Sequence, residues 1–493
     1  MNDKLNDALN GISDKYIEEA VNYKKPRKPY WIGAVAATLA LVILFSVIGP
    51  RGAADPTNPI LFYPTGTTGP DNGASSAPQP VLLANQLCAP ILPQMVEYPG
   101  KEYERYREWY DSQVEQYDQP RGYADSLDNF FAASIQQFLK GEGNQTYSPI
   151  NVYMALAMLA ESAEGESRQQ ILNLLGSGSI EALRTQAGHM WNAHYSADGL
   201  TTLLLSNSLW LDDAWNFEES TVDTLAKDYY ASLFNGDLGT EEMDSQLRQW
   251  LNSCTGNLLQ EQVEGVFLPP ETIVALASTV YFSAKWEADF DKNKTTSDTF
   301  HSPDGDVTAQ FMHNEFLAYA YYWGEHYGAI SLRLSGNNNM WLILPDEGYT
   351  TADILEEGEF LTMLQNLSSW EQYGAYKINL SLPKFDVVSK QELTDGLKKL
   401  GVTDVFDSSK ADLSGLITAD QSGLSPYISK TEHACRVKID EEGCEAAAYT
   451  LMAAAGAAPS AKDVIDFTLD RPFIFIINGR DSVPLFAGVV NEP

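Results

Sequence analysis

Cationic side chains are scarce in this chain of 493 residues, where 32 lysines and arginines stand against 67 aspartates and glutamates, a formal net charge of −35. Affinity for nucleic-acid phosphates requires a cationic surface, so this balance argues against a nucleic-acid partner. Acidity at this level mainly favours solubility. Apolar residues make up 44% of the chain, enough for a large core and more than one folded unit, which excludes a wholly disordered protein.

Cysteine is also rare, and the cysteines are not spaced as in known disulfide or metal motifs. The four cysteines lie far apart and form no CxxC pair: Cys88, Cys254, Cys435 and Cys444. This spacing indicates neither a disulfide framework nor a zinc site. We therefore expect free thiols, no metal site and no cofactor.

Sequence motifs of catalysis are missing as well. None of the six histidines belongs to an HExxH or other metal motif, and the chain has no GxSxG elbow, Walker loop or GxGxxG loop. The stretch SPDGDV at 302–307 is too short for a calcium loop. The sequence predicts no enzyme and no catalytic residue.

One long uncharged run, WIGAVAATLALVILFSVIG at 31–49, has the length to cross a membrane. As a helix rising ~1.5 Å per residue it would span roughly the ~30 Å of a bilayer core. Basic residues gather before it, and only Arg51 follows closely: Lys24, Lys25, Arg27 and Lys28. The sequence therefore predicts a single transmembrane helix with residues 1–30 in the cytoplasm and the rest outside the cell. The alternative is a cleaved signal peptide, which usually has a shorter apolar run.

The remaining chain divides into three parts by composition. Residues 50–80 are rich in Pro, Gly, Ser and Thr, which predicts a flexible linker. Residues 81–122 are dense in Tyr and Trp and are expected to pack against the main body. From 123 to 493, helical and strand patterns alternate without a strict βα rhythm, which predicts a large α+β domain with a sizeable antiparallel or mixed sheet. Ser148 followed by Pro149 predicts the start of a buried helix, and the closing RPFIFIINGRDSVPLFAGVV predicts a β-hairpin.

Seven segments of this body, in order, carry a resemblance to a known family. They are YSPINVYMALAML, SNSLWL, STVYFSAKWEADFD, MWLILPDEG, LPKFDVVSKQELTDGLKKLGVTDVFDSSKADLSGL, KIDEEGCEAAA and DRPFIFIINGRDSVPLFAGVV. Together they resemble the serpins. The resemblance implies a large central sheet, surrounding helices and an exposed reactive-centre loop. In serpins a protease attacks that loop and forms an acyl-enzyme, and the cleaved loop then inserts into the main sheet as a new strand.

The resemblance also places the parts of the reactive-centre loop. Its hinge would comprise Glu441, Glu442, Gly443, Cys444, Glu445, Ala446, Ala447 and Ala448. Counting fourteen residues on from Gly443, as the family's loops do, places the cleaved bond between Ala457 and Ala458, with Ala455–Gly456 as the next candidate. Composition alone equally allows a disordered Ala/Gly loop. The flanking KIDEEG and DRPFIFII favour a functional hinge.

Strand alternation tests whether this loop could be buried. One face would carry small or apolar residues: Cys444, Ala446, Ala448, Thr450, Met452 and Ala454. The other face would carry Glu445, Ala447, Tyr449 and Leu451, so insertion would bury no unpaired charge. Cys444 replaces the usual Thr or Ser, and Tyr449 is larger than is typical at its position.

The resemblance further implies two supporting sites. The shutter, which controls opening of the sheet, would comprise Ser148, Asn151, Ser278 and His433, with the usual Ser and Asn exchanged between Asn151 and Ser278. An Asn amide can hydrogen-bond both a hydroxyl and an imidazole, so the network could survive the exchange. Trp286 would lie at the breach, where insertion begins. Without the resemblance, Ser148 is a helix N-cap, and His433 and Trp286 are ordinary core residues.

These features predict a membrane-tethered, extracellular, monomeric inhibitor of serine proteases on a bacterial-type cell. Alanine before the cleaved bond suits the shallow apolar pocket of elastase-like or subtilisin-like proteases, because it would leave the carboxylate of a trypsin-like pocket unpaired. The alternative is a non-inhibitory serpin-like surface or adhesion protein.

Overall fold

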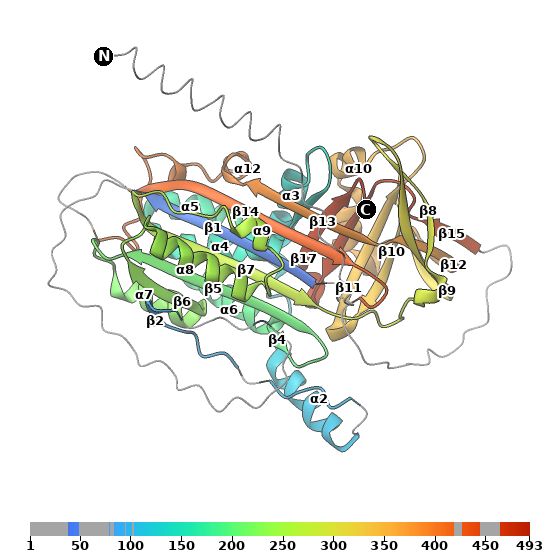
Figure 1. The fold of residues 1–493 in the computed structure, drawn as a ribbon, viewed down its shortest axis with the longest axis horizontal. Helices are drawn as coiled ribbons and strands as arrows, with labels where there is room; N and C mark the ends of the chain where they lie inside the picture. Colours follow the sequence, from blue (N-terminus) through green and yellow to red (C-terminus); the bar gives the residue numbers. More distant parts are fainter. Residues whose placement is uncertain are drawn as a thin grey trace, which may run out of the picture. The chain divides into compact units, whose positions relative to one another are not determined.

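The computed structural model describes residues 38–48, 78, 83–93, 95–100, 103–418, 426–443 and 464–493. These residues form two β-sheets with helices around them (Figure 1). The α+β class expected from the sequence is therefore confirmed.

The first sheet is eight-stranded, and all but one of its strand pairs are antiparallel. In spatial order its strands are β13 (Phe385–Glu392), β14 (Tyr427–Ile439), β1 (Thr38–Ile48), β7 (Thr272–Ser283), β5 (Thr202–Asp212), β6 (Ala231–Gly236) and β2 (Gln86–Cys88), with β4 (Ser196–Ala197) paired to β5. Only β5 and β6 are parallel. The segment β1, drawn in blue in Figure 1, thus lies between β14 and β7 although it is far from both in sequence.

The second sheet is nine-stranded and contains the C-terminal hairpin that the sequence predicts. Its strands, in order, are β15 (Val464–Thr468), β12 (Tyr373–Pro383), β9 (Gly305–Trp323), β10 (Tyr327–Leu334), β11 (Asn338–Pro345), β16 (Phe473–Asn478), β17 (Pro484–Val490) and β3 (Gln145–Tyr147), with β8 (Thr296–Ser302) paired to β9. The hairpin strands β16 and β17 are buried along their whole length, as their continuous apolar pattern indicates.

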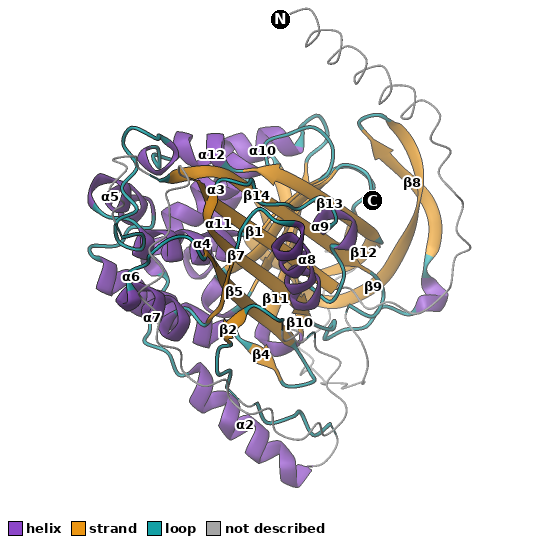
Figure 2. Cartoon of the chain, turned by 60° about the vertical axis from the view of Figure 1, so that its left-hand side comes forward, coloured by secondary structure: helices purple, strands orange, loops and turns teal. Residues whose placement is uncertain are grey.

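Helices lie around both sheets, and some of them cover the two faces of the first sheet. They are α2 (Tyr103–Tyr117), α3 (Asp128–Phe138), α4 (Pro149–Ser162), α5 (Gly165–Leu174), α6 (Ile180–His194), α7 (Glu219–Asp228), α8 (Glu241–Cys254), α9 (Gln260–Val263), α10 (Thr351–Glu357), α11 (Glu359–Gln365) and α12 (Thr394–Lys399). Figure 2 shows α8 and α9 over one face. The wholly buried α4 contacts β1 and β7 from the other face and also contacts β17 of the second sheet.

The aromatic-rich extension contacts the body through α2 and the segment before it. The Trp109 indole N–H donates to an Asp198 carboxylate oxygen at 3.0 Å, and the Tyr98 backbone N–H donates to the Asp198 carbonyl at 2.7 Å. The Arg480 guanidinium lies 3.5 Å from the centre of the Tyr117 ring. Of the four cysteines, Cys88, Cys254 and Cys435 are free thiols, and Cys444 lies outside the described residues.

The long apolar run departs from its predicted structure. Within residues 31–49, Thr38–Ile48 is a central β-strand and not part of a transmembrane helix. In the described parts of the chain, no helix is both long and apolar enough to span a bilayer. The physical reason is that TLALVILFSVI is rich in β-branched residues, and a strand buried on both faces needs a continuous apolar run just as a membrane helix does. The predicted cytoplasmic segment 1–30 and, apart from Pro78, the linker 50–80 lie outside the described residues.

Candidate functional site at the hinge and the central strand position

The hinge begins with a tight turn directly after β14. The Gly443 backbone N–H donates to the Asp440 carbonyl at 3.3 Å, and Gly443 has a φ of +69°. A Cβ atom at this position would lie 2.4 Å from the backbone nitrogen of Trp286. Both the left-handed backbone and the close approach to Trp286 therefore require glycine here.

Trp286 lies directly against this turn, at the breach position that the resemblance implies. Its indole N–H donates to the Asp440 carbonyl at 2.9 Å, and its side chain is buried. The Phe290 ring packs edge-on against it with centroids 5.7 Å apart. The indole thus fixes the point at which the chain leaves β14.

The first two hinge residues are held by charged partners from other elements. Glu441 is only 6% exposed, and its carboxylate pairs with the Lys384 ammonium at 2.8 Å and accepts from the Thr295 hydroxyl at 2.8 Å. Burial raises the pKa of Glu441, but its hydrogen bonds, first those with Lys384 and Thr295, and the charge of Lys384 together leave its pKa below the usual value. Glu442 pairs with Lys292.

The holding residues Lys384 and Thr295 were not predicted from the sequence. Thr295 is 146 residues from Glu441 in the chain, and nothing in its local sequence marks it as a hinge contact. Lys384 stands within LPKFDV, one of the segments that carry the family resemblance, so that segment was the available signal. The remaining hinge residues, Cys444–Ala448, and both residues of the expected cleaved bond, Ala457 and Ala458, lie outside the described residues.

The four shutter residues come together beneath the sheet. The Ser148 hydroxyl accepts from the Asn151 backbone N–H at 3.4 Å and so caps α4. The Asn151 amide group donates to the Ser278 carbonyl at 3.2 Å, and its oxygen accepts from the Ser278 hydroxyl at 2.5 Å. His433 enters through its Nε2, which accepts from the Ser148 backbone N–H at 3.4 Å. Asn151 and Ser278 therefore remain hydrogen-bonded to each other with their usual identities exchanged.

His433 is the electrostatically unusual member of the shutter. It is completely buried, and burial lowers its pKa to about 3, so it is neutral at pH 7. Its ring packs on Tyr147 with centroids 5.3 Å apart. Because Nε2 accepts a hydrogen bond, the proton is on Nδ1, which has no partner among the described residues.

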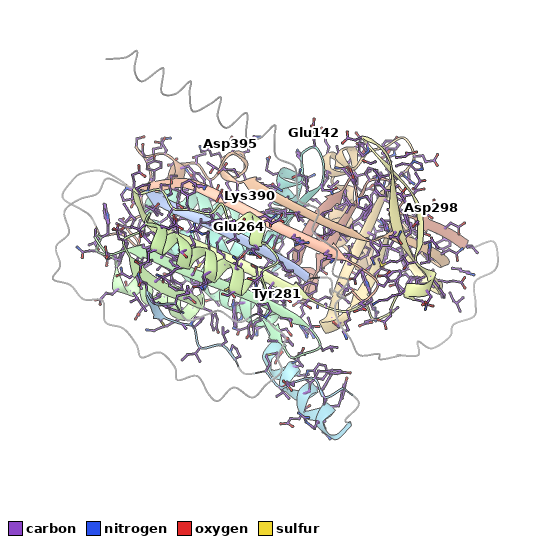
Figure 3. The ribbon with its side chains drawn as sticks, viewed as in Figure 1. Glu142, Glu264, Tyr281, Asp298, Lys390 and Asp395 are labelled. Atoms are coloured by element: carbon purple, nitrogen blue, oxygen red, sulfur yellow. The ribbon has the colours of Figure 1, made fainter. Side chains whose placement is uncertain are left out.

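β1 passes directly between the two shutter strands. In its antiparallel registers, Ile43 is opposite His433 of β14 on one side and Ser278 of β7 on the other. Ala40 is likewise opposite Arg436 and Tyr281, the latter labelled in Figure 3. We call the position between β14 and β7 the strand slot. In this structure Thr38–Ile48 fills the slot.

A family model described as Serpin (serine protease inhibitor) matches residues 126–493. The chain belongs to the serpin family. Serpins are inhibitors of serine proteases and not enzymes, which agrees with the absence of catalytic motifs from the sequence.

Curated relatives share more than a quarter of their aligned residues with this serpin. Leukocyte elastase inhibitor from Homo sapiens is 28% identical over 379 residues, covering 75% of this chain and 97% of that protein. Alpha-1-antiproteinase 2 from Equus caballus is 28% identical over 376 residues, covering 74% of this chain and 85% of the relative.

Solved structures confirm the serpin fold. Native tengpin, a thermophilic serpin, matches with a TM-score of 0.65 and 24% identity over 76% of this chain and 95% of its own. The native stressed conformation of AtSerpin1 from Arabidopsis also has a TM-score of 0.65 and 24% identity, over 76% of this chain and 100% of its own.

Proposed function

We propose that this serpin traps serine proteases by a suicide mechanism in which the cleaved reactive-centre loop inserts into the strand slot. The observation that carries the proposal is the geometry at the end of β14. The chain turns there between Asp440 and Gly443, against Trp286, and β14 itself borders the strand slot. A loop that folded back from this turn would run antiparallel to β14.

The slot also has the capacity for a full strand. β1 pairs antiparallel with both of its neighbours, and Ala40, near the start of β1, lies opposite Arg436, near the end of β14. β1 therefore runs in the direction that an inserted loop would take. The hinge residues supply only small side chains on the face that would turn inward, so the same position would accept them without overpacking.

The finer claims on specificity rest on the sequence of the loop. We propose cleavage between Ala457 and Ala458 and elastase-like or subtilisin-like targets, because a small residue before the bond fits a shallow apolar pocket. The name of the human relative, leukocyte elastase inhibitor, supports this class of target.

We also propose that the serpin is tethered to a membrane through residues 31–49, outside a bacterial-type cell, and that it acts as a monomer. Support comes from the length of the apolar run and from the basic residues before it. This anchoring requires that Thr38–Ile48 leave the strand slot, because one segment cannot be a strand and a membrane span at once.

One observation favours the second candidate, a non-inhibitory serpin-like surface or adhesion protein. A slot already filled by β1 leaves no room for the loop. Incubation of the full chain with elastase separates the two candidates. A covalent complex that survives SDS, even in a minor fraction, supports inhibition, and cleavage with no complex supports the alternative.

The variant Ala446→Arg makes this test specific for insertion. Residue 446 is on the face that would be buried, so an arginine there would place an unpaired charge inside the sheet. We expect the SDS-stable complex to fall at least tenfold while elastase still cleaves the loop. Ala447→Arg, which would point to the opposite face, toward α8 and α9, is the matched control for an added hinge arginine and should lose less of the complex than Ala446→Arg does. Equal complex yields for Ala446→Arg and the wild type would refute insertion.

A further inference from the structure

β1 is a better strand for the slot than the reactive-centre loop is. Its segment TLALVILFSVI is rich in β-branched and large apolar residues, whereas the loop residues after Gly443 are mainly alanines. β-branched and aromatic side chains favour strands, and alanine is depleted from them.

The described side chains of β1 are packed on both faces of the sheet. Leu44 joins the cluster beneath α8 and α9, together with Trp250 and Ala277. Phe45 and Val47 belong to the main core on the side of α4. All four described side chains, Leu44, Phe45, Ser46 and Val47, are no more than 3% exposed. The segment is therefore an integrated core strand.

β1 also lies between the two strands that carry the shutter residues His433 and Ser278. Because Ile43 is opposite both Ser278 and His433, the shutter strands are held apart by β1 at the level where an inserting loop must pass. A backbone strand position holds one chain at a time, so β1 and the loop exclude each other.

We propose that Thr38–Ile48 is an intramolecular plug of the strand slot, and that the serpin traps a protease only after this plug has left. Occupancy of the slot by the plug is independent of the proposed function, but the effect on trapping rests on it. With the plug seated, the cleaved loop has no position to enter, the acyl-enzyme is hydrolysed, and the protease is released.

The plug has a built-in weak end. Its pairing with β14 is irregular between Ser46 and Val47, and its pairing with β7 is irregular between Val47 and Ile48. The buried Ser46 hydroxyl has no hydrogen-bond partner among the residues described. An irregular ladder and an unsatisfied polar group both weaken a strand, so departure begins at the Ile48 end.

A native thiol makes the occupancy testable. Cys435 of β14 is buried and free, and it lies opposite Leu41 of β1. Residues directly opposite in an antiparallel pair have Cα atoms ~4.5–5.5 Å apart and project to the same face, within the range that a disulfide spans. The variant Leu41→Cys should therefore form a disulfide with Cys435 on mild oxidation. Val42→Cys, opposite Ala434 and on the other face, is the matched control.

The experiment uses the full chain, oxidised and then reduced, with mass spectrometry to identify the joined cysteines and elastase to measure trapping. We expect the cross-link between positions 41 and 435 to form in most molecules, the oxidised variant to be cleaved without an SDS-stable complex, and reduction to restore trapping at least tenfold. A second variant, Phe45→Glu, loosens the plug without a cross-link and should raise the trapped fraction above that of the wild type. Ile91→Glu, at an 86% exposed position, controls for the added charge.

Each outcome has a distinct meaning. Failure of Leu41→Cys to cross-link more than Val42→Cys overturns the plug, whatever the protease does. A cross-linked protein that traps elastase as well as its reduced form overturns the gating of insertion. A specific cross-link with no trapping by any form, including Phe45→Glu, supports the plug and refutes the proposed inhibitory function.

Discussion

At the scale of single residues, the shutter combines a hydrogen-bonded pair, Asn151 and Ser278, with a buried histidine, His433, that resists protonation. Asn151 and Ser278 hydrogen-bond each other with exchanged identities, so the network needs the pair and not a fixed order. His433 differs, because a buried imidazole accepts a proton only at a cost in free energy. The unfolded chain has no such restriction.

We expect His433 to make the protein lose stability in mild acid. Its folded pKa of about 3 lies below the unfolded value of ~6.5, so between these values the unfolded state binds a proton that the folded state does not. The free energy of unfolding should therefore fall as pH drops from ~6.5 toward ~3, by roughly 1.4 kcal/mol per pH unit at most. Urea unfolding at pH 7, 5 and 4 measures the slope, which His433→Gln should reduce.

The control is His301, which lies on the surface and pairs with Asp306. That pairing raises the pKa of His301, the direction opposite to that of His433. His301→Gln should leave the acid slope nearly unchanged. A His433→Gln protein with the full wild-type slope would show that other groups govern acid stability.

At the scale of elements, β1 shows where sequence reasoning fails for a physical reason. An apolar run without alternation fits a membrane helix and equally fits a strand with both faces buried. The flanking charges favoured the helix, and the β-branched content favoured the strand. The choice depends on whether β14 and β7 present an open position, which is a long-range property absent from the local sequence.

Other elements were predictable because their signals are local. Ser148 followed by Pro149 marked the start of α4, and the hairpin of β16 and β17 followed from two apolar runs around a turn. The four residues that the family resemblance assigns to the shutter are hydrogen-bonded neighbours in the structure, and their role in opening the sheet stays a prediction. The contacts of Glu441 with Lys384 and Thr295 were missed because they join distant segments.

Ser46 offers a way to tighten β1. Its buried hydroxyl lacks a partner among the described residues, and an unsatisfied buried polar group costs about 1–3 kcal/mol. Ser46→Val should therefore raise the free energy of unfolding by about 1 kcal/mol and lower the fraction of elastase trapped. Denaturant unfolding and SDS gels measure the two effects.

Ser46→Thr is the matched control, since threonine has nearly the shape of valine but keeps the hydroxyl. It should gain less stability than Ser46→Val and trap more protease. If the two variants trap the same fraction of elastase, the unpaired hydroxyl does not weaken the binding of β1 in the slot.

At the scale of the whole molecule, two segments far apart in the chain would compete for the strand slot in our proposal. They are the plug, Thr38–Ile48, and the reactive-centre loop. In the proposed mechanism, the loop is the part that selects the protease. Ala457→Arg should transfer recognition to trypsin-like proteases, whose pocket carboxylate pairs with arginine, and reduce the rate with elastase by at least tenfold. Mass spectrometry of the released fragment checks the cleaved bond.

Ala458→Arg is the comparison for the Ala457→Arg variant, because it places the same charge after the bond. An SDS-stable complex between Ala457→Arg and trypsin supports the assignment, whereas trypsin cleavage after residue 457 without a complex does not. Continued trapping of elastase by that variant, with no reaction toward trypsin, would move the bond to Ala455–Gly456.

Because the slot between β14 and β7 is filled, inhibition by the proposed mechanism would depend on kinetic competition between two steps. Once the acyl-enzyme has formed with β1 still seated, hydrolysis by the protease and departure of β1 are both unimolecular steps. The share of protease that is trapped is then a ratio of two rates, and diluting or concentrating either protein does not change it. A protease that hydrolyses the acyl-enzyme slowly would be trapped when β1 departs, whereas a protease that hydrolyses it quickly would be released after cleaving the loop. Under the proposed mechanism, the serpin would discriminate among proteases by their rate of deacylation as well as by their specificity pockets.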